Sequence, residues 1–189
     1  MRRIFPCLFA AALIALAGCA AEAPAAVSPT GTATVAATLS PEPAATPVLA
    51  DVTLYLPDAE LAGLIAVSAK SEDSPRGLLS ALVDAGALPD VDYGSNISFG
   101  VANETISTED GEISGVILRL DLSDAFAQAV RQVGAQKEAL LLQSLVNTFL
   151  VRYHADAMIL TIEGTVLETA YGKYEDPMTF DEFVSTASN

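Results

Sequence analysis

The stretch from 135 to 164, AQKEALLLQSLVNTFLVRYHADAMILTIEG, decides the fold. Its first part repeats apolar residues at helical spacing, which predicts an amphipathic helix from about Ala135 to Tyr153. A mostly apolar run from Ala157 to Glu163 follows and ends at Gly164, which predicts a strand. The apolar face of the helix is expected to consist of Leu141, Leu142, Leu145, Val146 and Phe149.

Two more elements are predicted toward the N-terminus. The run VTLYL at 52–56 alternates between apolar and polar residues and ends at Pro57, which predicts a strand. The polar stretch after it carries no predicted element. Ser74 and Pro75 are expected at the N-cap and first turn of a helix that ends before Gly86. The apolar stripe of that helix is Leu78, Leu79, Leu82 and Val83.

Between the two helices the sequence predicts an antiparallel hairpin. Apolar runs at 97–101 and 105–107 precede the turn-like 109–111, EDG, and a strand follows at 116–121. Ser123 is expected to cap a short turn that holds Phe126. The tail after Gly164 is expected to be irregular.

The predicted order is therefore strand-helix-strand-strand-helix-strand. Such a chain buries its apolar faces by pairing the strands into one small mixed sheet and laying both helices on the same face. The expected fold is an α+β two-layer sandwich, formed by a single domain at 51–189. A domain of this size buries about two thirds of the surface that its unfolded chain would expose.

The N-terminus predicts export. Arg2 and Arg3 precede an apolar run at 4–16, which is too short to span a bilayer, since a span needs about 20 residues. The run LAGC at 16–19 resembles the bacterial lipobox. This resemblance implies a signal peptide at 1–18, cleavage between Gly18 and Cys19, and lipid on the Cys19 thiol. The alternative is a secreted protein that is cut nearby and keeps Cys19 as a free thiol.

Lipidation of Cys19 would determine where the mature protein lies. Cys7 leaves with the signal, so no disulfide partner for Cys19 remains in the chain. The expected location is the outer face of the cell membrane, or the outer membrane in an organism with two membranes. Residues 20–50 are rich in Ala, Pro, Thr and Ser, which predicts a disordered tether behind the lipidated cysteine.

Charge limits the partners. The chain has 24 acidic and 9 basic residues, a formal net charge of -15, and the signal peptide would remove Arg2 and Arg3. A field of this sign repels phosphate backbones, and no Lys/Arg cluster offsets it, so nucleic acid is not an expected partner. The acidic excess is expected either to solvate the surface or to attract a basic partner.

No residue pattern predicts catalysis, a metal or a cofactor. His154 is the only histidine, and a hydrolase pairing it with Asp156 lacks a Gly-x-Ser-x-Gly motif. One histidine and one lipid-bound cysteine cannot furnish a zinc site. The carboxylates of 90–92 and 109–112 lack the spacing of a calcium loop, and the chain has no tryptophan for a sugar cleft and no phosphate-binding loop.

Several stretches resemble the GerMN family, the sporulation and spore germination domain of bacterial lipoproteins. The similarity spans 51–170. It is carried by VTLYLP at 52–57, 78–89, LDLS at 120–123 with Phe126, QSLVNTF at 143–149 and ILTIEG at 159–164. The resemblance implies a ring-building-like fold, protein contacts outside the membrane and no catalytic residues. It also marks Asn147, Thr148 and Gly164 as family-motif residues, which we expect to be structural.

The leading hypothesis is a membrane-anchored lipoprotein whose non-catalytic domain contacts envelope proteins or copies of itself through a sheet edge or helix face. The family resemblance adds a link to sporulation or germination. One alternative is a lipoprotein that binds a solute or peptidoglycan fragment. A hydrolase using His154 or a carboxylate pair is the third.

Overall fold

The computed structural model of the chain describes residues 48–95 and 97–181. The expected signal peptide, the Gly18–Cys19 cleavage site and most of the expected tether lie outside the described residues. The last two residues of the expected tether, Leu49 and Ala50, belong to the first strand.

The first two strands form a hairpin. Strand β1 (Leu49–Pro57) pairs antiparallel with β2 (Leu64–Glu72) along its whole length. Asp58 holds the connection, because its Oδ1 accepts hydrogen bonds from the backbone N–H of Glu60 (3.1 Å) and of Ala62 (2.8 Å). The prediction of no element after β1 is wrong, since most side chains of β2 are exposed and an edge strand of this kind shows little apolar pattern.

Helix α1 (Pro75–Asp84) begins as predicted. Ser74 is its N-cap, and the Ser74 hydroxyl accepts a hydrogen bond from the N–H of Gly77 over 2.9 Å. Gly86, with φ 76°, follows the end of the helix, where a residue without a Cβ adopts the left-handed conformation most readily.

The long hairpin is the next feature. Strand β3 (Ser98–Thr108) pairs antiparallel with β4 (Gly111–Leu122), which confirms the predicted hairpin. The two runs expected before the turn form one continuous strand. Strand β5 (Ala157–Ile162) then pairs with β4 in parallel, through Ile117 to Leu122.

Two helices connect β4 to β5. Helix α2 (Asp124–Val130) replaces the short turn predicted after Ser123. Ser123 stands at its N-cap but makes no side-chain capping bond, and its hydroxyl donates to the carbonyl of Asp92. Helix α3 (Ala135–Tyr153) has the predicted bounds and ends at His154 in the left-handed conformation, with φ 52°.

The tail after Gly164 is not irregular, which corrects the prediction. Strand β6 (Thr165–Glu168) pairs with β5 and with β7 (Lys173–Tyr174), and β8 (Met178–Thr179) pairs with β5. Strands this short carry no readable alternation, and tertiary contacts specify them instead.

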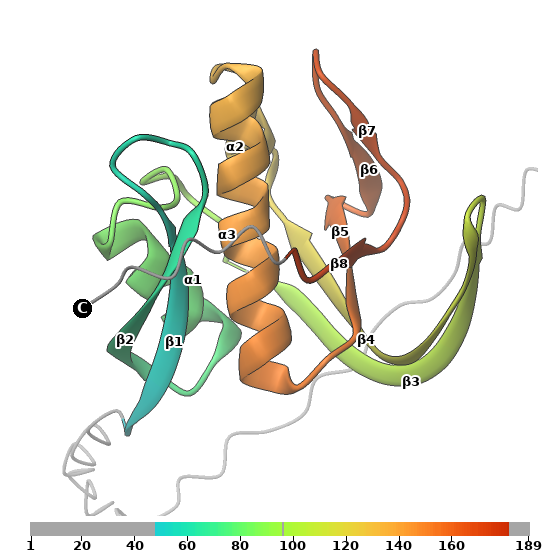
Figure 1. Cartoon of the computed structure of the whole chain (residues 1–189), viewed down its shortest axis with the longest axis horizontal. Helices are drawn as coiled ribbons and strands as arrows, with labels where there is room; N and C mark the ends of the chain where they lie inside the picture. Colours follow the sequence, from blue (N-terminus) through green and yellow to red (C-terminus); the bar gives the residue numbers. More distant parts are fainter. Residues whose placement is uncertain (1–47, 96, 182–189) are drawn as a thin grey trace, which may run out of the picture. The chain divides into compact units, whose positions relative to one another are not determined.

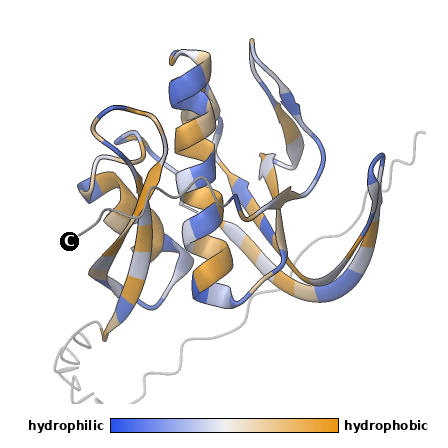
Figure 2. Cartoon of the chain, in the orientation of Figure 1, coloured by the Kyte–Doolittle hydropathy of each residue, from blue (hydrophilic) through white to orange (hydrophobic). Residues whose placement is uncertain are grey.

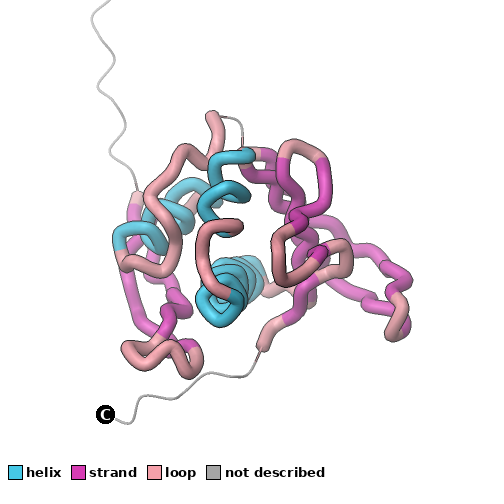
Figure 3. The backbone as a smooth tube through the Cα atoms, turned by 90° about the horizontal axis from the view of Figure 1, so that it is seen from above, coloured by secondary structure: helices cyan, strands magenta, loops and turns pink. Residues whose placement is uncertain are grey.

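The strands form two sheets, so the predicted single sheet is wrong. Strands β1 and β2 make one, and the other has the order β3-β4-β5-β6-β7 with β8 beside β5. Helix α3 lies between the two sheets (Figures 1 and 3). The predicted α+β sandwich class is confirmed, with helices and mixed sheets packed in layers.

One core joins both sheets to the helices. Figure 2 shows that α1 and β1 are largely hydrophobic, while α3 alternates between hydrophobic and hydrophilic patches along its length. Phe126, Leu145 and Phe149 are fully buried. Burying one such side chain stabilises the fold by about 1.5–3 kcal/mol. All five apolar residues predicted for the α3 stripe are buried.

Candidate functional site

Asn147 and Thr148 of α3 bind the backbones of two segments that are distant in the sequence. Both side chains are fully buried. Thr148 Oγ1 accepts the N–H of Tyr55 in β1 over 3.0 Å. Asn147 Oδ1 accepts the N–H of Asp181 (3.2 Å), and Asn147 Nδ2 donates to the Asp181 carbonyl (3.0 Å). The two side chains therefore hold β1 and the segment after β8 against the helix.

Gly164 lies in the turn between β5 and β6. Its φ of 77° is in the left-handed region that favours glycine. Its N–H donates to Asp121 Oδ1 over 2.8 Å, and the same oxygen accepts the Thr161 hydroxyl over 2.6 Å. Gly164 and Asp121 together fix the position of the turn.

His154 and Asp156 do not form a catalytic pair. His154 is exposed at the C-cap of α3. The Asp156 carboxylate is directed at β4, where its Oδ2 accepts the N–H of Val116 over 2.8 Å. The Asp156 N–H donates to the Val116 carbonyl, also over 2.8 Å. Asp156 therefore fixes the middle of β4 beside the start of β5.

The loop carboxylates considered for calcium do not converge. Asp92 Oδ1 accepts the N–H of Gly94 over 2.9 Å, which closes a local turn. Within the ranges that the structure describes, no three His, Cys, Asp or Glu side chains gather as a metal-binding group.

Glu138 is a buried carboxylate that the sequence-based site prediction did not include. It is 0% exposed in the first turn of α3. Its Oε1 accepts hydrogen bonds from the hydroxyls of Tyr174 (2.6 Å) and Thr169 (2.7 Å). Its Oε2 has no partner in the described part of the chain. Burial, and secondly the hydrogen bond to Glu138, raise the pKa of the Tyr174 hydroxyl.

Surface hollows in the described part of the chain are shallow. An apolar one of about 250 Å³ lies between the β1–β2 connection and α3 and is lined partly by Leu61, Leu64 and Leu140. Two other open hollows, both beside α1, measure about 350 and 360 Å³, at the lower end of the roughly 300–1,000 Å³ that small-molecule sites usually enclose. None of the residues lining the five hollows is His154 or Glu138.

The outer edge of β3 is unpaired in the described residues, as is one side of β1, β2 and β7, and β3 is the longest of these four strands. Strand β3 ends the order of the six-stranded sheet, so only one of its sides is paired within the described residues. In an antiparallel pair, facing residues alternate between those that exchange hydrogen bonds and those whose N–H and C=O point away. Val116 is of the second kind, because both groups bond to Asp156 on the side away from β3.

The same alternation shows which amides of β3 are free to pair. Asn103 faces Val116 in the register, so its N–H and C=O point outward from the sheet. The N–H and C=O groups of Val101 and Thr105, two residues away on each side, point outward too. All three side chains are exposed, and Val101 is 52% exposed although it lies two residues from Phe99, which packs on Tyr153.

Natural sheet edges are usually protected by lysine, proline, bulges or shortness. Strand β3 has 11 residues, SFGVANETIST, with no lysine or proline. Its one charged residue, Glu104, is paired with Arg119 of β4 through bonds of 3.2 and 2.9 Å. The sequence predicted this hairpin but not which of its sides stays open, because that depends on where β5 pairs.

A membrane-spanning helix is not found within residues 48–95 and 97–181: none there is both long and apolar enough.

Comparison with known proteins gives similarity to GerMN domains. The tandem GerMN domains of the sporulation protein GerM from Bacillus subtilis are 18% identical to this chain, with a TM-score of 0.46, over 70% of this chain and 46% of theirs. The first GerMN domain of that protein is 20% identical, with a TM-score of 0.42, over 70% of this chain and 98% of its own. This chain thus matches about half the length of the tandem structure.

No family model matches the sequence, and no curated protein matches it. The proposals that follow therefore rest on the residues of this chain. The resemblance expected from the sequence is found again among solved structures: this chain is similar to GerMN domains.

Proposed function

We propose that this protein is a lipid-anchored envelope lipoprotein whose folded domain binds another protein through the outer edge of β3 and catalyses no reaction. The chain is exported, cut before Cys19 and held at the outer face of a membrane by lipid on that cysteine. Support for the anchor comes from the run LAGC at 16–19 and the apolar segment before it. Two acyl chains are enough for stable anchoring.

The observation that carries the binding function is the unpaired edge of β3. Its outward N–H and C=O groups at Val101, Asn103 and Thr105 form a row that an extended segment can pair with. Main-chain hydrogen bonds would supply affinity, and the exposed side chains between them would supply specificity.

The residues whose side chains could take part in catalysis support a non-catalytic role, because most of them are engaged in structural hydrogen bonds. Asp156 binds the backbone of β4, Asn147 binds the backbone after β8, and Glu138 binds two hydroxyls. His154 stands exposed at a helix end, with no acidic side chain bonded to it among the described contacts.

The test is site-specific crosslinking in intact cells. A photoreactive amino acid is placed at Asn103 on the β3 edge and, as the matched control, at exposed Val67 on β2. We expect one discrete adduct with an envelope protein from position 103 and none from position 67. Equal, diffuse labelling from both positions would refute the proposed function.

A further inference from the structure

We infer that the segment received by the β3 edge is an extended polypeptide rich in lysine or arginine. This inference rests on the proposed function and adds the chemistry of the partner. A strand added to β3 would lie one strand spacing from β3 and two from β4, which places it within about 10 Å of β4 side chains.

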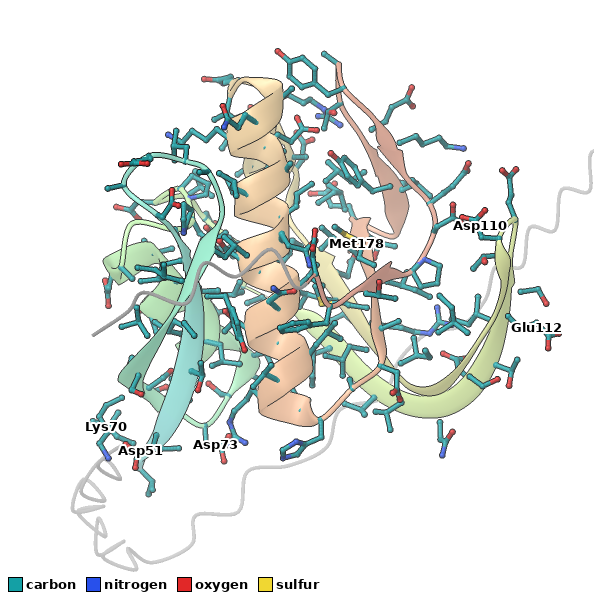
Figure 4. All side chains as sticks on the ribbon, viewed as in Figure 1. Asp51, Lys70, Asp73, Asp110, Glu112 and Met178 are labelled. Carbon is teal, nitrogen blue, oxygen red and sulfur yellow. The ribbon has the colours of Figure 1, made fainter. Side chains whose placement is uncertain are left out.

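Carboxylates gather at the end of the hairpin. Glu109 and Asp110 form the turn between β3 and β4, and Glu112 faces Ser107 of β3 in the register. Figure 4 shows Asp110 and Glu112 at the far end of this hairpin. None of the three is in an ion pair among the residues that the structure describes.

Three cations of the domain are engaged away from this turn, and Arg119, which lies on the hairpin, is paired with Glu104. Arg76 donates to the carbonyls of Gly94 and Ser95, and Arg152 pairs with Asp73. Lys70 pairs with Asp51 at 2.6 Å, and Figure 4 shows these two together at the start of β1. The hairpin end thus keeps a local negative field. At physiological salt, charges are screened beyond about 8 Å, so this field acts on the end of an added strand that lies beside Ser107 and Thr108, next to the turn.

Charge also decides between a basic partner and a second copy of this chain. The chain carries a formal net charge of -15, so two copies meeting at their β3 edges would bring like fields together. A basic strand instead gains the attraction along with the main-chain hydrogen bonds. Complementary charge raises the association rate and selects the partner.

Peptide binding tests the inference on the lipidated mature protein in detergent micelles. The probes are two fluorescent peptides of equal length, one alternating valine with lysine and one alternating valine with glutamate. Anisotropy titrations should give a dissociation constant at least tenfold lower for the lysine peptide. Raising the salt from about 50 to about 300 mM should narrow that difference, because it screens the carboxylates.

Two pairs of variants locate the effect. Asn103→Pro removes an outward N–H, which edge positions tolerate, and should weaken lysine-peptide binding more than tenfold, while Asn103→Ala keeps the N–H and should change it less than twofold. Asp110→Asn with Glu112→Gln should weaken it several-fold. Glu60→Gln with Asp84→Asn removes the same charge from exposed sites elsewhere and should not.

Four results would overturn the inference. Equal affinity for the two peptides, no binding of either, or unchanged binding by Asn103→Pro would each exclude a basic strand at this edge. Concentration-dependent dimers that Asn103→Pro abolishes would show that a second copy of the chain binds at the β3 edge. The edge would then still be the binding site, but its partner would not be a basic strand. Failure of the proposed function itself is separate, because it appears as no adduct at position 103 in cells.

Discussion

The Tyr174 hydroxyl of β7 donates a 2.6 Å hydrogen bond to Oε1 of Glu138 in α3. The same carboxylate oxygen accepts the Thr169 hydroxyl, so one buried residue holds both ends of the connection between β6 and β7. The long helix thereby fixes a hairpin that has very short strands.

Removing this acceptor should loosen the hairpin. Glu138→Ala leaves the Tyr174 and Thr169 hydroxyls without their partner, and we expect a loss of about 2–4 kcal/mol in the free energy of unfolding. Urea denaturation with a Glu138→Ala/Tyr174→Phe double-mutant cycle measures the pair itself. A coupling energy of about 1 kcal/mol is expected, and strictly additive losses would show that the bond contributes nothing.

Alkaline pH should act on the same contact. The pKa of Tyr174 is raised, so the fold favours the neutral hydroxyl relative to the unfolded chain, in which tyrosine ionises near about 10. This contribution to stability is complete below that pH and is lost as the pH rises above it. Urea midpoints should fall more steeply above about pH 10 for the native chain than for Tyr174→Phe. Exposed Tyr171→Phe serves as the control and should keep the native slope.

Thr148 should be needed for the contact between α3 and β1. Thr148→Val keeps the shape but leaves the partly buried N–H of Tyr55 without an acceptor, at a cost of about 1–3 kcal/mol. Thr148→Ser keeps the hydroxyl and should lose only about 1 kcal/mol for its methyl group. Thermal unfolding of the two variants compares them, and equal losses would contradict the role of the hydroxyl.

Alanine substitutions at Gly115, Gly111 and Gly100 distinguish the effect of a steric contact from that of backbone strain. Gly115 has φ 144°, and an added Cβ would lie 2.1 Å from Asp156 Oδ2, the atom that binds Val116. Gly111 has φ 140° with open space around it, and Gly100 has open space and no such φ. Alanine should therefore destabilise most at 115, less at 111 and least at 100, by about 3, 1 and under 1 kcal/mol. Calorimetry gives the order, and equal effects at 115 and 111 would exclude the Asp156 contact.

The anchor has its own matched pair of variants. Cys19→Ala removes the only thiol that we expect in the mature chain, so the protein should leave the detergent phase and accumulate as uncleaved or soluble material. Cys7→Ala changes a residue of the predicted signal peptide and should leave the protein lipid-bound. Mass spectrometry of the N-terminal peptide detects the acyl chains, and an unmodified Cys19 in the native protein would contradict the anchor.

The sequence predicts the long periodic elements best. Helices α1 and α3 were found from their apolar stripes, and the Ser74 cap from its position before Pro75. Glu138 lies three residues before Leu141 and four before Leu142, so the same stripe could have placed it in the core.

What the sequence could not supply is long-range pairing. Strand β2 is mostly exposed, and β7 and β8 are only two residues long, so their patterns are no different from those of loops. The division into two sheets depends on which strands pair with one another, and α3 lies between the two sets. The open edge of β3 follows from β5 pairing in parallel with β4, about forty residues away along the chain.

Hydrogen exchange at the β3 amides tests the central claim most directly. The lipidated protein is compared in native membranes and after purification in detergent, with exchange resolved for β3 and for β2. The account predicts slower exchange at Val101, Asn103 and Thr105 in native membranes and equal exchange along β2. Identical exchange of these three amides in both states would contradict it.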